Sequence, residues 1–366
     1  MKNIHLIAAA RPNFMKIAPL YHALSRESWC RASIVHTGQH YDPNMSDAFF
    51  RDLAMPKPHF HLEIGSGSHA EQTGGVMMAY EKVAVAEKPD WIVVVGDVNS
   101  TAACAMVGAK LWIPVVHLEA GLRSRDRRMP EEINRLVTDA IADVLWTPSR
   151  DGDENLLREG VPAERIECIG NIMIDSYEMM RGAIEADATR GGLGLEAGGY
   201  GVVTLHRPSN VDTREALAPL VGALLEVSRR VPLVFAVHPR TRKKLQEFGL
   251  MERLAGSGTI RVVDPLGYIQ FMNLVTGARV VITDSGGVQE ETTYLGIPCL
   301  TLRENTERPV TVTEGSNRLV QPGALVAALD AVLARPGRAG RIPELWDGHA
   351  ADRAVASLKR RSGVAA

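Results

Sequence analysis

The chain has few cysteines, and their placement excludes two classes of protein. Its four cysteines, Cys30, Cys104, Cys168 and Cys299, are isolated from one another and show no metal-ligand spacing. A small secreted scaffold held by disulfides and a structural zinc site both need grouped cysteines. The thiols are therefore expected to be reduced, as in the cytoplasm, and no metal site is predicted.

Net charge and long apolar runs are also scarce. The formal net charge is −2 and no long basic run occurs, so the sequence indicates neither nucleic acid nor a membrane surface as a partner. No apolar stretch approaches transmembrane length. The first residues, MKNIHLIAAARPN, hold only a short apolar run that leads into a helical pattern, unlike a secretion signal. We expect a soluble cytoplasmic protein.

Short apolar runs rich in β-branched residues alternate with segments of helical periodicity, which is typical of parallel α/β sheets. The predicted strands are Ile4–Ala8, Ser33–His36, Trp91–Val95, Val115–Leu118, Val144–Trp146, Ile166–Ile169, Val202–Leu205, Leu233–Val237, Ile260–Val263, Val280–Thr283 and Cys299–Leu302. The predicted helices are Met15–Ser25, Ala70–Glu87, Thr101–Leu111, Glu131–Ala142, Asp153–Glu159, Glu215–Arg229, Lys243–Phe248, Tyr268–Val275, Gly287–Leu295, Leu325–Leu333 and Ala350–Arg361.

At 366 residues the chain exceeds one small core, so we predict two Rossmann-like, doubly wound parallel-sheet domains facing a cleft. The first covers residues 1–171 and is joined by a C-terminal helix within 347–362. The second covers residues 172–346. The stretch Ala183–Gly199, rich in Gly and Ala, is predicted to be a surface connection. In such folds the chemistry lies at the C-terminal ends of the strands.

Paired glycines follow the predicted strand Val280–Thr283, in the stretch Asp284-Ser285-Gly286-Gly287. Such a pair lets the backbone turn sharply and aim its N–H groups at an anion, and the next helix adds the positive end of its dipole. An ordinary strand-to-helix loop with an Asp or Ser cap is the alternative. Gln289, Glu290 and Glu291 lie in the first turns of that helix, where a carboxylate can hold the hydroxyl pair of a sugar.

Two basic residues lie after the first strand. Arg11 follows it directly, and Lys16 is expected on the opening turn of the next helix. Both can hold phosphate oxygens. The alternative is a pair of solvated surface charges.

Three acids are expected at one edge of the first sheet. Asp97 and Glu119 end two successive strands, and Glu131 opens the following helix. Carboxylates brought together in this way are suited to general acid–base work, because proximity pushes their proton affinities apart. Asp97 can instead cap the next helix. Glu131 can be either a reacting acid or a partner of the helix dipole, whereas Glu132 beside it is predicted to be only such a partner.

Two histidines follow strands of the second domain. His206 and His238 stand at equivalent strand ends, each near an arginine, which favours contact with a ligand over a structural role. Arg308 follows the strand beside the paired glycines and is expected to reach a ribose or a phosphate.

One motif is set aside. Gly65-Ser66-Gly67-Ser68-His69-Ala70 matches the dinucleotide pattern G-x-G-x-x-A. It lies outside the first βα unit and precedes no strand that ends in an acid, so nicotinamide binding is not favoured there. A mobile loop is expected instead, and no cofactor is predicted.

Ten motifs then occur in order nearly from end to end: ARPNFMKIAPL, TGQHYD, GDVNST, HLEAGLRS, PEEINR, GNIMID, TLHRPSN, VHPR, DSGGVQEE and TERPVTV. Together they resemble the non-hydrolysing UDP-N-acetylglucosamine 2-epimerases. The resemblance implies a GT-B arrangement, a homodimer, a role in cell-surface polysaccharide biosynthesis, and interconversion of UDP-N-acetylglucosamine with UDP-N-acetylmannosamine. It assigns sugar and phosphate contacts to Arg11, Lys16, Asp97, Glu119, Glu131 and His206. It assigns UDP contacts to Leu266, Phe271, Ser285, Gly286, Gly287, Glu291 and Arg308.

The chain departs from the family pattern in three places. Asn13 stands in a position that is usually acidic, Ser209 replaces the acid after the His-Arg motif, and the stretch after Gln39 and His40 differs. These departures concern sugar specificity and a possible regulatory second substrate site at Gln39 and His40, where we expect little substrate activation. UDP-2,3-diacetamido-glucuronate is the alternative substrate.

The sugar itself restricts the mechanism. Its C2 hydrogen has no neighbouring carbonyl, so epimerisation needs either transient oxidation or loss of UDP together with the C2 proton. Paired carboxylates and phosphate-binding groups favour elimination and re-addition, with electrostatic stabilisation of the departing UDP. A GT-B glycosyltransferase would need an acceptor groove, which the sequence does not indicate. A non-catalytic sugar-nucleotide sensor would have lost the acids, and all three are present here.

Overall fold

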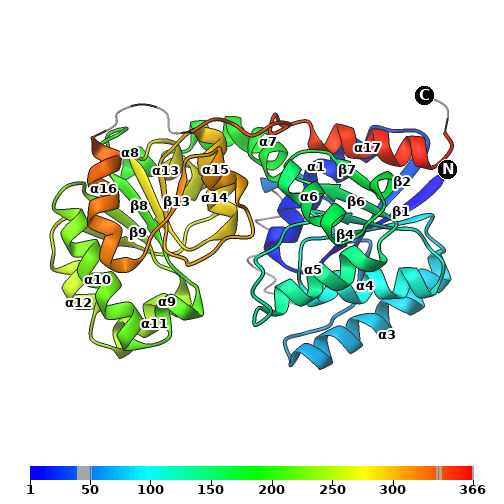
Figure 1. The fold of residues 1–366 in the computed structure, drawn as a ribbon, viewed down its shortest axis with the longest axis horizontal. Helices are drawn as coiled ribbons and strands as arrows, with labels where there is room; N and C mark the ends of the chain where they lie inside the picture. The colour runs from blue at the N-terminus through cyan, green and yellow to red at the C-terminus, as the bar shows by residue number, and fades with distance from the viewer. Residues whose placement is uncertain (39–49, 51, 335–336, 338–339, 365–366) are drawn as a thin grey trace. The chain divides into compact units, whose positions relative to one another are not determined.

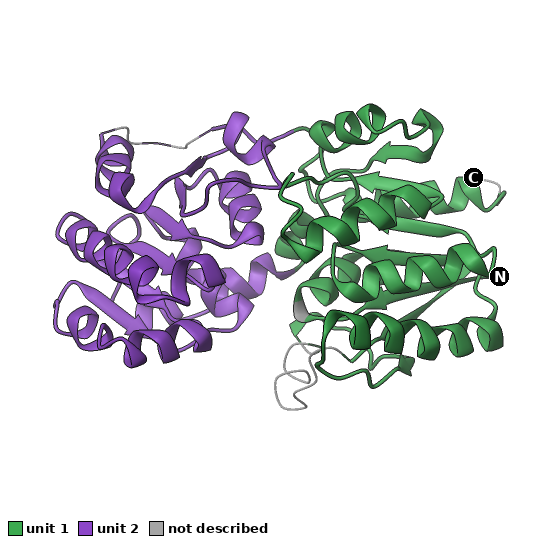
Figure 2. Ribbon diagram, turned by 60° about the horizontal axis from the view of Figure 1, so that its bottom comes forward, with its two compact units in different colours: residues 1–179, 344–366 green, residues 180–343 purple. Residues whose placement is uncertain are grey.

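The computed structural model describes residues 1–38, 50, 52–334, 337 and 340–364, with the Arg11 side chain outside the description (Figure 1). The chain divides into two compact units (Figure 2). Unit 1 is Met1–Met179 with Glu344–Ala366, and unit 2 is Met180–Pro343. The division falls within helix α7 (Ile172–Ala186) and before Glu344, whereas the sequence placed it after residue 171 and before residue 347.

Unit 1 is built on one parallel sheet. Its strand order is β3-β2-β1-β4-β5-β6-β7. The strands are β1 Lys2–Ala8, β2 Cys30–His36, β3 Phe60–His61, β4 Trp91–Val95, β5 Val115–Leu118, β6 Val144–Thr147 and β7 Ile166–Cys168. The helices are α1 Arg11–Ser25, α3 His69–Glu87, α4 Asn99–Lys110, α5 Pro130–Ile141, α6 Arg150–Arg158, α7 Ile172–Ala186 and α17 Ala350–Arg361.

The middle strand of this sheet, β4, is apolar throughout, as expected for a parallel sheet covered on both faces. Every residue of β4 is buried. The C-terminal helix α17 packs on α1. The indole N–H of Trp91 donates to Ser362 at the end of α17 (2.9 Å), and that of Trp146 donates to Ser357 within it (3.1 Å). A segment far along the chain therefore completes the first unit.

Unit 2 repeats the plan with the order β10-β9-β8-β11-β12-β13. The strands are β8 Gly201–Thr204, β9 Leu233–Ala236, β10 Ile260–Val263, β11 Val280–Thr283, β12 Cys299–Thr301 and β13 Asn317–Leu319. The helices are α8 Thr189–Gly192, α9 Pro208–Val211, α10 Arg214–Ser228, α11 Pro239–Glu247, α12 Met251–Ala255, α13 Tyr268–Thr276, α14 Gly286–Leu295, α15 Val310–Thr313 and α16 Leu325–Leu333.

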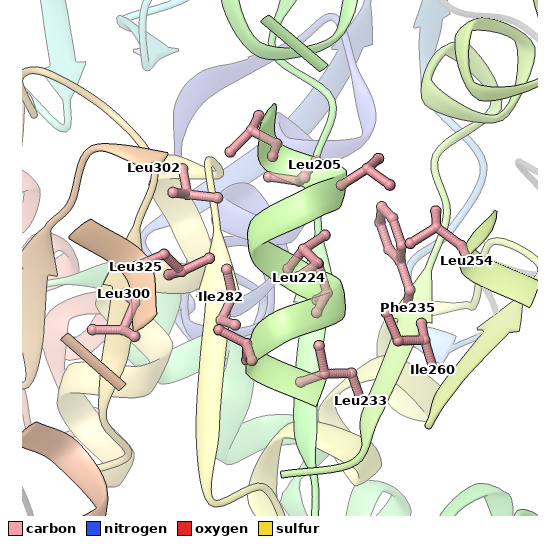
Figure 3. Close-up of a cluster of buried hydrophobic side chains, with 14 of the residues drawn as sticks. Leu205, Leu224, Leu233, Phe235, Leu254, Ile260, Ile282, Leu300, Leu302 and Leu325 are labelled. Carbon is pink, nitrogen blue, oxygen red and sulfur yellow. The ribbon is translucent and has the colours of Figure 1, made fainter. Parts of the chain in front are cut away.

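The core of unit 2 lies between α10 and the sheet (Figure 3). Leu217, Leu220, Val221 and Leu224 recur at helical spacing and form the buried stripe of α10. They meet strand residues such as Phe235 and Ile282. Burying such a side chain contributes about 1.5–3 kcal/mol, so this interface fixes the sheet that carries the strand ends.

In each sheet, the order in which successive strands are added reverses at the first strand. In unit 1, β1 lies between β2 and β4, and in unit 2, β8 lies between β9 and β11. At such a switch point the loops after two neighbouring strands separate, and ligands of open α/β sheets bind there. The loops after β1 and β4, and after β8 and β11, are therefore where this topology places ligand-binding residues.

Some elements differ from the prediction. The strands β3 and β13 were not predicted, since two or three residues are too short to show a pattern. Helix α1 begins at Arg11, so Lys16 lies in its second turn rather than its opening turn. The stretch Ala183–Gly199 is not simply a connection, because α7 runs to Ala186 and α8 follows.

Within the described residues, each helix is too short or too polar to cross a lipid bilayer.

Candidate active site

The β1–β4 switch of unit 1 is tied together by Asn13. Its Oδ1 accepts from the backbone N–H of Ala9 and Ala10 (3.3 and 3.0 Å), and its Nδ2 donates to the Val95 carbonyl (3.2 Å). The side chain is buried, and it uses both halves of its amide. An ionised carboxylate has no proton to donate to Val95, so asparagine serves this clamp in a way that the family's usual acid cannot.

Gly96 follows β4 and leaves room for two charged side chains. Its φ is 66°, in the left-handed region. A Cβ there would lie 3.3 Å from Glu119 Oε2 and 3.5 Å from Lys16 Nζ. The glycine therefore serves both the turn and the close approach of an acid and a base from β5 and α1.

Lys16 and Glu119 form a buried ion pair beside Gly96. Glu119 has a φ of 76°, which is unusual for a residue with a side chain. Its N–H and that of Ala120 both donate to the Trp146 carbonyl at 3.0 Å, which holds the strained turn at the end of β5. Such strain costs about 1–3 kcal/mol and concentrates at functional sites.

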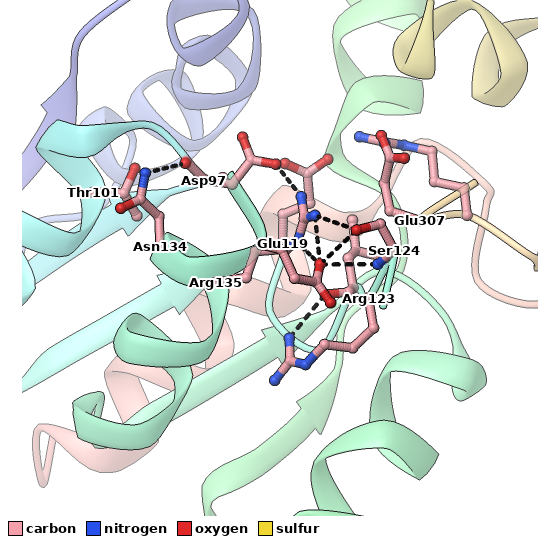
Figure 4. Close-up of polar contacts among 12 residues, drawn as sticks. Asp97, Thr101, Glu119, Arg123, Ser124, Asn134, Arg135 and Glu307 are labelled. Atoms are coloured by element: carbon pink, nitrogen blue, oxygen red, sulfur yellow. Dashed lines mark hydrogen bonds and ion pairs between the residues drawn. The ribbon is translucent and has the colours of Figure 1, made fainter. Parts of the chain in front are cut away.

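Asp97 pairs with Arg135 of α5 (Figure 4). The Asp97 side chain is 34% exposed while that of Arg135 is 2% exposed, so the acid faces outward from a buried guanidinium. The Asp97 carbonyl accepts from Asn134 Nδ2 (2.9 Å). Asp97 does not cap α4, because Val98 is the N-cap and no side-chain cap bond is formed there. The capping alternative was therefore wrong.

Glu132 is not the simple dipole partner that the sequence suggested. It is buried, and it accepts from the N–H groups of Ser124 and Arg125 (both 2.9 Å) and from Arg135 Nη2 (2.6 Å). Burial favours the neutral acid, but these hydrogen bonds and the guanidinium outweigh it and lower the pKa of Glu132. Glu131, by contrast, is exposed in the first turn of α5.

A fully buried histidine, His117, also holds the loop that follows β4. His117 Nε2 lies 2.8 Å from the Gly96 carbonyl, and its Nδ1 lies 2.5 Å from Asp139 Oδ1. A carbonyl oxygen and a carboxylate oxygen are both acceptors, so each ring nitrogen of His117 faces an acceptor. Burial alone would raise the pKa of Asp139, but His117 and Arg123 lower it. The sequence analysis missed this pair.

The rejected dinucleotide motif is a loop that leads into helix α3, which begins at His69. Ser68 is the N-cap of α3, where its N–H donates to Glu71 (2.8 Å) and its Oγ accepts from the Glu71 N–H (3.3 Å). This reciprocal capping box was readable in the sequence Ser-x-x-Glu.

In unit 2, His206 is held by Asp284 across the β8–β11 switch. Asp284 is fully buried and accepts from the His206 and Arg207 N–H groups (both 3.0 Å), from Asn210 Nδ2 (3.0 Å) and from His206 Nδ1 (2.9 Å). Burial favours the neutral acid, but these donors lower the pKa of Asp284. Nδ1 of His206 therefore carries a proton, and Nε2 is left for other chemistry. The imidazole is 39% exposed.

His238 has a structural contact that the sequence analysis did not anticipate. Its Nδ1 accepts from the Arg240 N–H (3.2 Å), which caps α11. Burial, the nearby His206 and Arg240 lower its pKa, with Asp284 opposing. The two imidazoles lie 5.7 Å apart between centroids, so His238 still borders His206.

Ser285, Gly286 and Gly287 open helix α14, with Ser285 as the N-cap. Neither glycine has a positive φ, so the turn from β11 into α14 does not depend on a left-handed backbone at either one. A Cβ at Gly286 would lie 2.8 Å from Arg308 Nη1, whereas one at Gly287 would meet no described atom within 4 Å outside its own helix turn. The N-terminus of this helix is therefore open on the Gly287 side, as an anion needs.

Arg308 lies at this helix end between two buried acids. It pairs with Glu307 (2.6 Å) and Glu290 (2.9 Å). Burial favours neutral Glu307, but Arg308 and Arg303 together hold its pKa well below the ordinary range. Gln289 is buried beneath the same loop and accepts from Thr306 and Asn317 (2.8 and 2.9 Å). The loop is thus fixed from inside.

Glu291 is buried, unlike a residue that simply faces a ligand. Burial raises its pKa to about 8, aided by the nearby Glu290 and opposed by a hydrogen bond from Tyr268. Tyr268 opens α13, and Leu266 and Phe271, both half-buried, flank that helix start. Gln39 and His40 lie outside the described residues, and so does the side chain of Arg11.

The family model described as UDP-N-acetylglucosamine 2-epimerase matches residues 22–359 of this chain. The chain belongs to that family. Among its relatives, a Methanocaldococcus jannaschii protein named UDP-N-acetylglucosamine 2-epimerase is 43% identical over 87% of this chain and 88% of its own length. A Pseudomonas aeruginosa protein named UDP-2,3-diacetamido-2,3-dideoxy-D-glucuronate 2-epimerase is 42% identical over 86% and 87%.

Solved epimerase structures share the fold. The crystal structure of the M. jannaschii UDP-GlcNAc 2-epimerase in complex with UDP-GlcNAc and UDP matches with a TM-score of 0.89, 40% identity, and coverage of 98% of this chain and 99% of that one. The predicted fold class, two Rossmann-like parallel α/β domains of the GT-B kind, is confirmed. Membership of an epimerase family also sets aside the glycosyltransferase and sensor alternatives.

Proposed function

We propose that this epimerase reversibly interconverts UDP-N-acetylglucosamine and UDP-N-acetylmannosamine by elimination of UDP and its re-addition. The observation that supports this chemistry is a pair of ionic contacts at the ends of two neighbouring strands. Glu119 pairs with Lys16, and Asp97 pairs with Arg135. Each acid is kept next to a cation, which favours its ionised form. An ionised carboxylate can accept a proton from carbon, as the first step requires.

In the proposed first step a carboxylate takes the C2 proton while the bond from C1 to the phosphate oxygen breaks. The electron pair of the C2–H bond becomes the C1=C2 double bond of a 2-acetamidoglucal, and UDP departs with the electrons of the C1–O bond. Return of a proton to the opposite face of C2, with re-addition of UDP to C1, gives the other epimer. Asp97, Glu119 and Glu131 are the proposed acids for the two faces.

The departing UDP gains negative charge, which the cationic groups stabilise. His206, with Nδ1 fixed by Asp284, can present Nε2 to the leaving phosphate. Lys16 and Arg11 are the proposed phosphate contacts of unit 1, and Ser285, Gly286, Gly287 and Arg308 those of unit 2. Preorganised donors of this kind supply the largest single contribution to many enzymes. We propose that Leu266, Phe271 and Glu291 hold the uridine and that His238 borders the phosphates.

Proton NMR in heavy water tests this mechanism. Incubation with UDP-N-acetylglucosamine and no added nicotinamide should produce the manno epimer with deuterium at C2, together with traces of free UDP and the glucal. A nicotinamide hydride would return to C2 without solvent label. Turnover with no deuterium at C2 would contradict elimination.

The 42% identity to the P. aeruginosa diacetamido-glucuronate epimerase supports a second candidate substrate. Parallel assays with the two UDP-sugars decide between them by the ratio of kcat/KM. We further propose a homodimer in the cytoplasm that feeds cell-surface polysaccharide synthesis. Around Gln39 and His40 we propose little substrate activation, so the reverse reaction should start without added UDP-N-acetylglucosamine.

A further inference from the structure

Arg135 is one of the largest fully buried side chains of the described chain, with 2% of its surface exposed. A buried guanidinium is costly unless acids and hydrogen-bond acceptors surround it. Two acids do so here. Its Nη1 contacts Asp97 Oδ2, while its Nε and Nη2 reach Glu132 Oε2 at 3.1 and 2.6 Å (Figure 4). The arginine thus joins an outward-facing acid to a buried one.

Glu132 is anchored independently of Arg135. Its Oε2 accepts from the N–H and the hydroxyl of Ser124 (2.9 and 3.0 Å), and its Oε1 accepts from the Arg125 N–H (2.9 Å). Both carboxylate oxygens are therefore fixed by the loop that follows β5. The position of Arg135 is set by this acid, and the guanidinium in turn sets the rotation of the Asp97 carboxylate.

The surroundings of Asp97 leave Arg135 as its cation on the α5 side. Asn134, also from α5, holds the Asp97 carbonyl (2.9 Å), and His117 from β5 holds the carbonyl of the preceding Gly96 (2.8 Å). Lys16 of α1 faces the same loop but is paired with Glu119. The backbone of Asp97 is thus fixed by two elements, and its carboxylate contacts the guanidinium of Arg135.

We propose that Arg135, held by Glu132, is a positioning residue for the epimerisation: it orients the Asp97 carboxylate and keeps it ionised for proton transfer at C2. This inference rests on the proposed function, because it takes Asp97 as a reacting acid. Arg135 itself does not reach the sugar in this proposal. Its effect is to be sought in turnover and its pH dependence, not in nucleotide binding.

The test compares Arg135→Gln with Arg135→Lys. The amide of Gln keeps a donor but removes the charge, so kcat should fall about 10- to 100-fold, which corresponds to one charge-assisted hydrogen bond. The acid limb of the kcat profile should move to higher pH by roughly 1 to 3 units, because Asp97 loses its cation. Lys restores the charge but not the planar geometry of the guanidinium. The acid limb should therefore return to its wild-type pH, while kcat should stay about 10-fold below the wild-type value.

Two controls separate this role from a loss of folding. UDP affinity, measured by calorimetry, should be unchanged in both variants, since Arg135 binds Asp97 and Glu132 and is not itself a proposed UDP contact. Arg353→Lys is the matched control: that arginine also binds an acid, Asp347 (2.7 Å), and a buried carbonyl, Ile169 (2.6 Å), within unit 1. It should lower thermal stability without displacing the acid limb.

Wild-type activity separates failure of this inference from failure of the proposed function. If the wild type epimerises neither UDP-sugar, the proposed function fails. If the wild type is active and both Arg135 variants keep its kcat and acid limb, the positioning role is overturned. If Arg135→Gln loses UDP binding through misfolding, Arg135→Lys decides: a wild-type kcat overturns the proposal, and a reduced kcat with unchanged UDP affinity supports it.

Discussion

The two units present opposite charges on the same architecture. At the switch point of unit 1, the side chains that face outward include an acid, Asp97, and a buried cation, Arg135, lies behind it. At the switch point of unit 2, the outward group is a base, His206, and a buried acid, Asp284, lies behind it. Arg308 also pairs with two buried acids, Glu290 and Glu307, but is itself buried.

This inversion shows how one fold can supply two kinds of chemistry. The strand order places loops together in both units, but the buried partner decides which charge the exposed group carries. Acids backed by cations suit proton transfer at carbon, and cations backed by acids suit a departing phosphate. Four predictions test this division, in order of their expected effect on turnover.

The largest effect is expected for Glu119→Gln. The amide keeps the shape of the side chain but cannot take a proton, so kcat should fall by about 10² to 10⁴, the usual contribution of general acid–base catalysis. UDP affinity should change far less than kcat, because Gln can still accept a hydrogen bond from Lys16 and the proposed UDP contacts of unit 2 stay intact. Steady-state kinetics and calorimetry measure the two quantities. A normal kcat in this variant would show that Glu119 takes no part in proton transfer, and would contradict the assignment of that step to the acids of unit 1.

Asp284→Asn should reduce turnover by about 10- to 100-fold, the loss expected for charge-assisted hydrogen bonds. Asn can no longer offer carboxylate oxygens to His206 Nδ1 and to the two N–H groups, so the ring loses its fixed tautomer. Asp212→Asn is the control, because that acid binds Arg240 (2.6 Å) on the surface. Equal losses in both variants would argue against a specific dyad.

Gly287→Val should weaken UDP binding about 10-fold by obstructing the helix end, roughly one charge-assisted hydrogen bond. Among the described residues, leaving out its chain neighbours and its own helix backbone, no atom lies within 4 Å of an added Cβ, so the fold should not change. Gly286→Val is less informative, because its Cβ would displace Arg308 and Glu307 directly. Calorimetric titration of UDP decides the matter, and an unchanged affinity in Gly287→Val would place the phosphates elsewhere.

Glu291→Gln should have the smallest effect on turnover and a clear effect on stability. The folded-state pKa of Glu291 is raised from 4.5 to about 8, so the unfolded chain ionises first. Wild-type stability should therefore fall as pH rises from about 4.5 to about 8 and level off above it. Gln has no such loss, so its melting temperature should exceed that of the wild type by a growing margin across this window. Parallel melting curves would contradict a neutral Glu291.

Much of the fold was readable from local pattern. The strands Trp91–Val95, Val115–Leu118, Ile260–Val263 and Val280–Thr283 were predicted at their observed bounds, because short β-branched runs between turns have few alternatives. Helix ends were less certain. Capping decides them, and α1 begins four residues before the predicted Met15.

The placement of site residues at strand ends was also readable, since parallel strands bring their C-terminal ends to one edge. The sequence alone thus determined the fold class, the family and the loops that matter. It could not determine partners. Glu131 and Glu132 are neighbours of the same type, yet the first is exposed and the second is buried among Ser124, Arg125 and Arg135.

Only the tertiary structure decided which charge supports which group. Arg135 and Asp97 are 38 positions apart, and His206 and Asp284 are 78 apart. No local period relates such pairs, because they meet only when separate strands and helices pack together. Burial then sets the energy of each charge, and burial is a property of the packed chain. The sequence therefore determined which edge of each sheet carries the site residues. Packing determined which charged groups are paired at that edge.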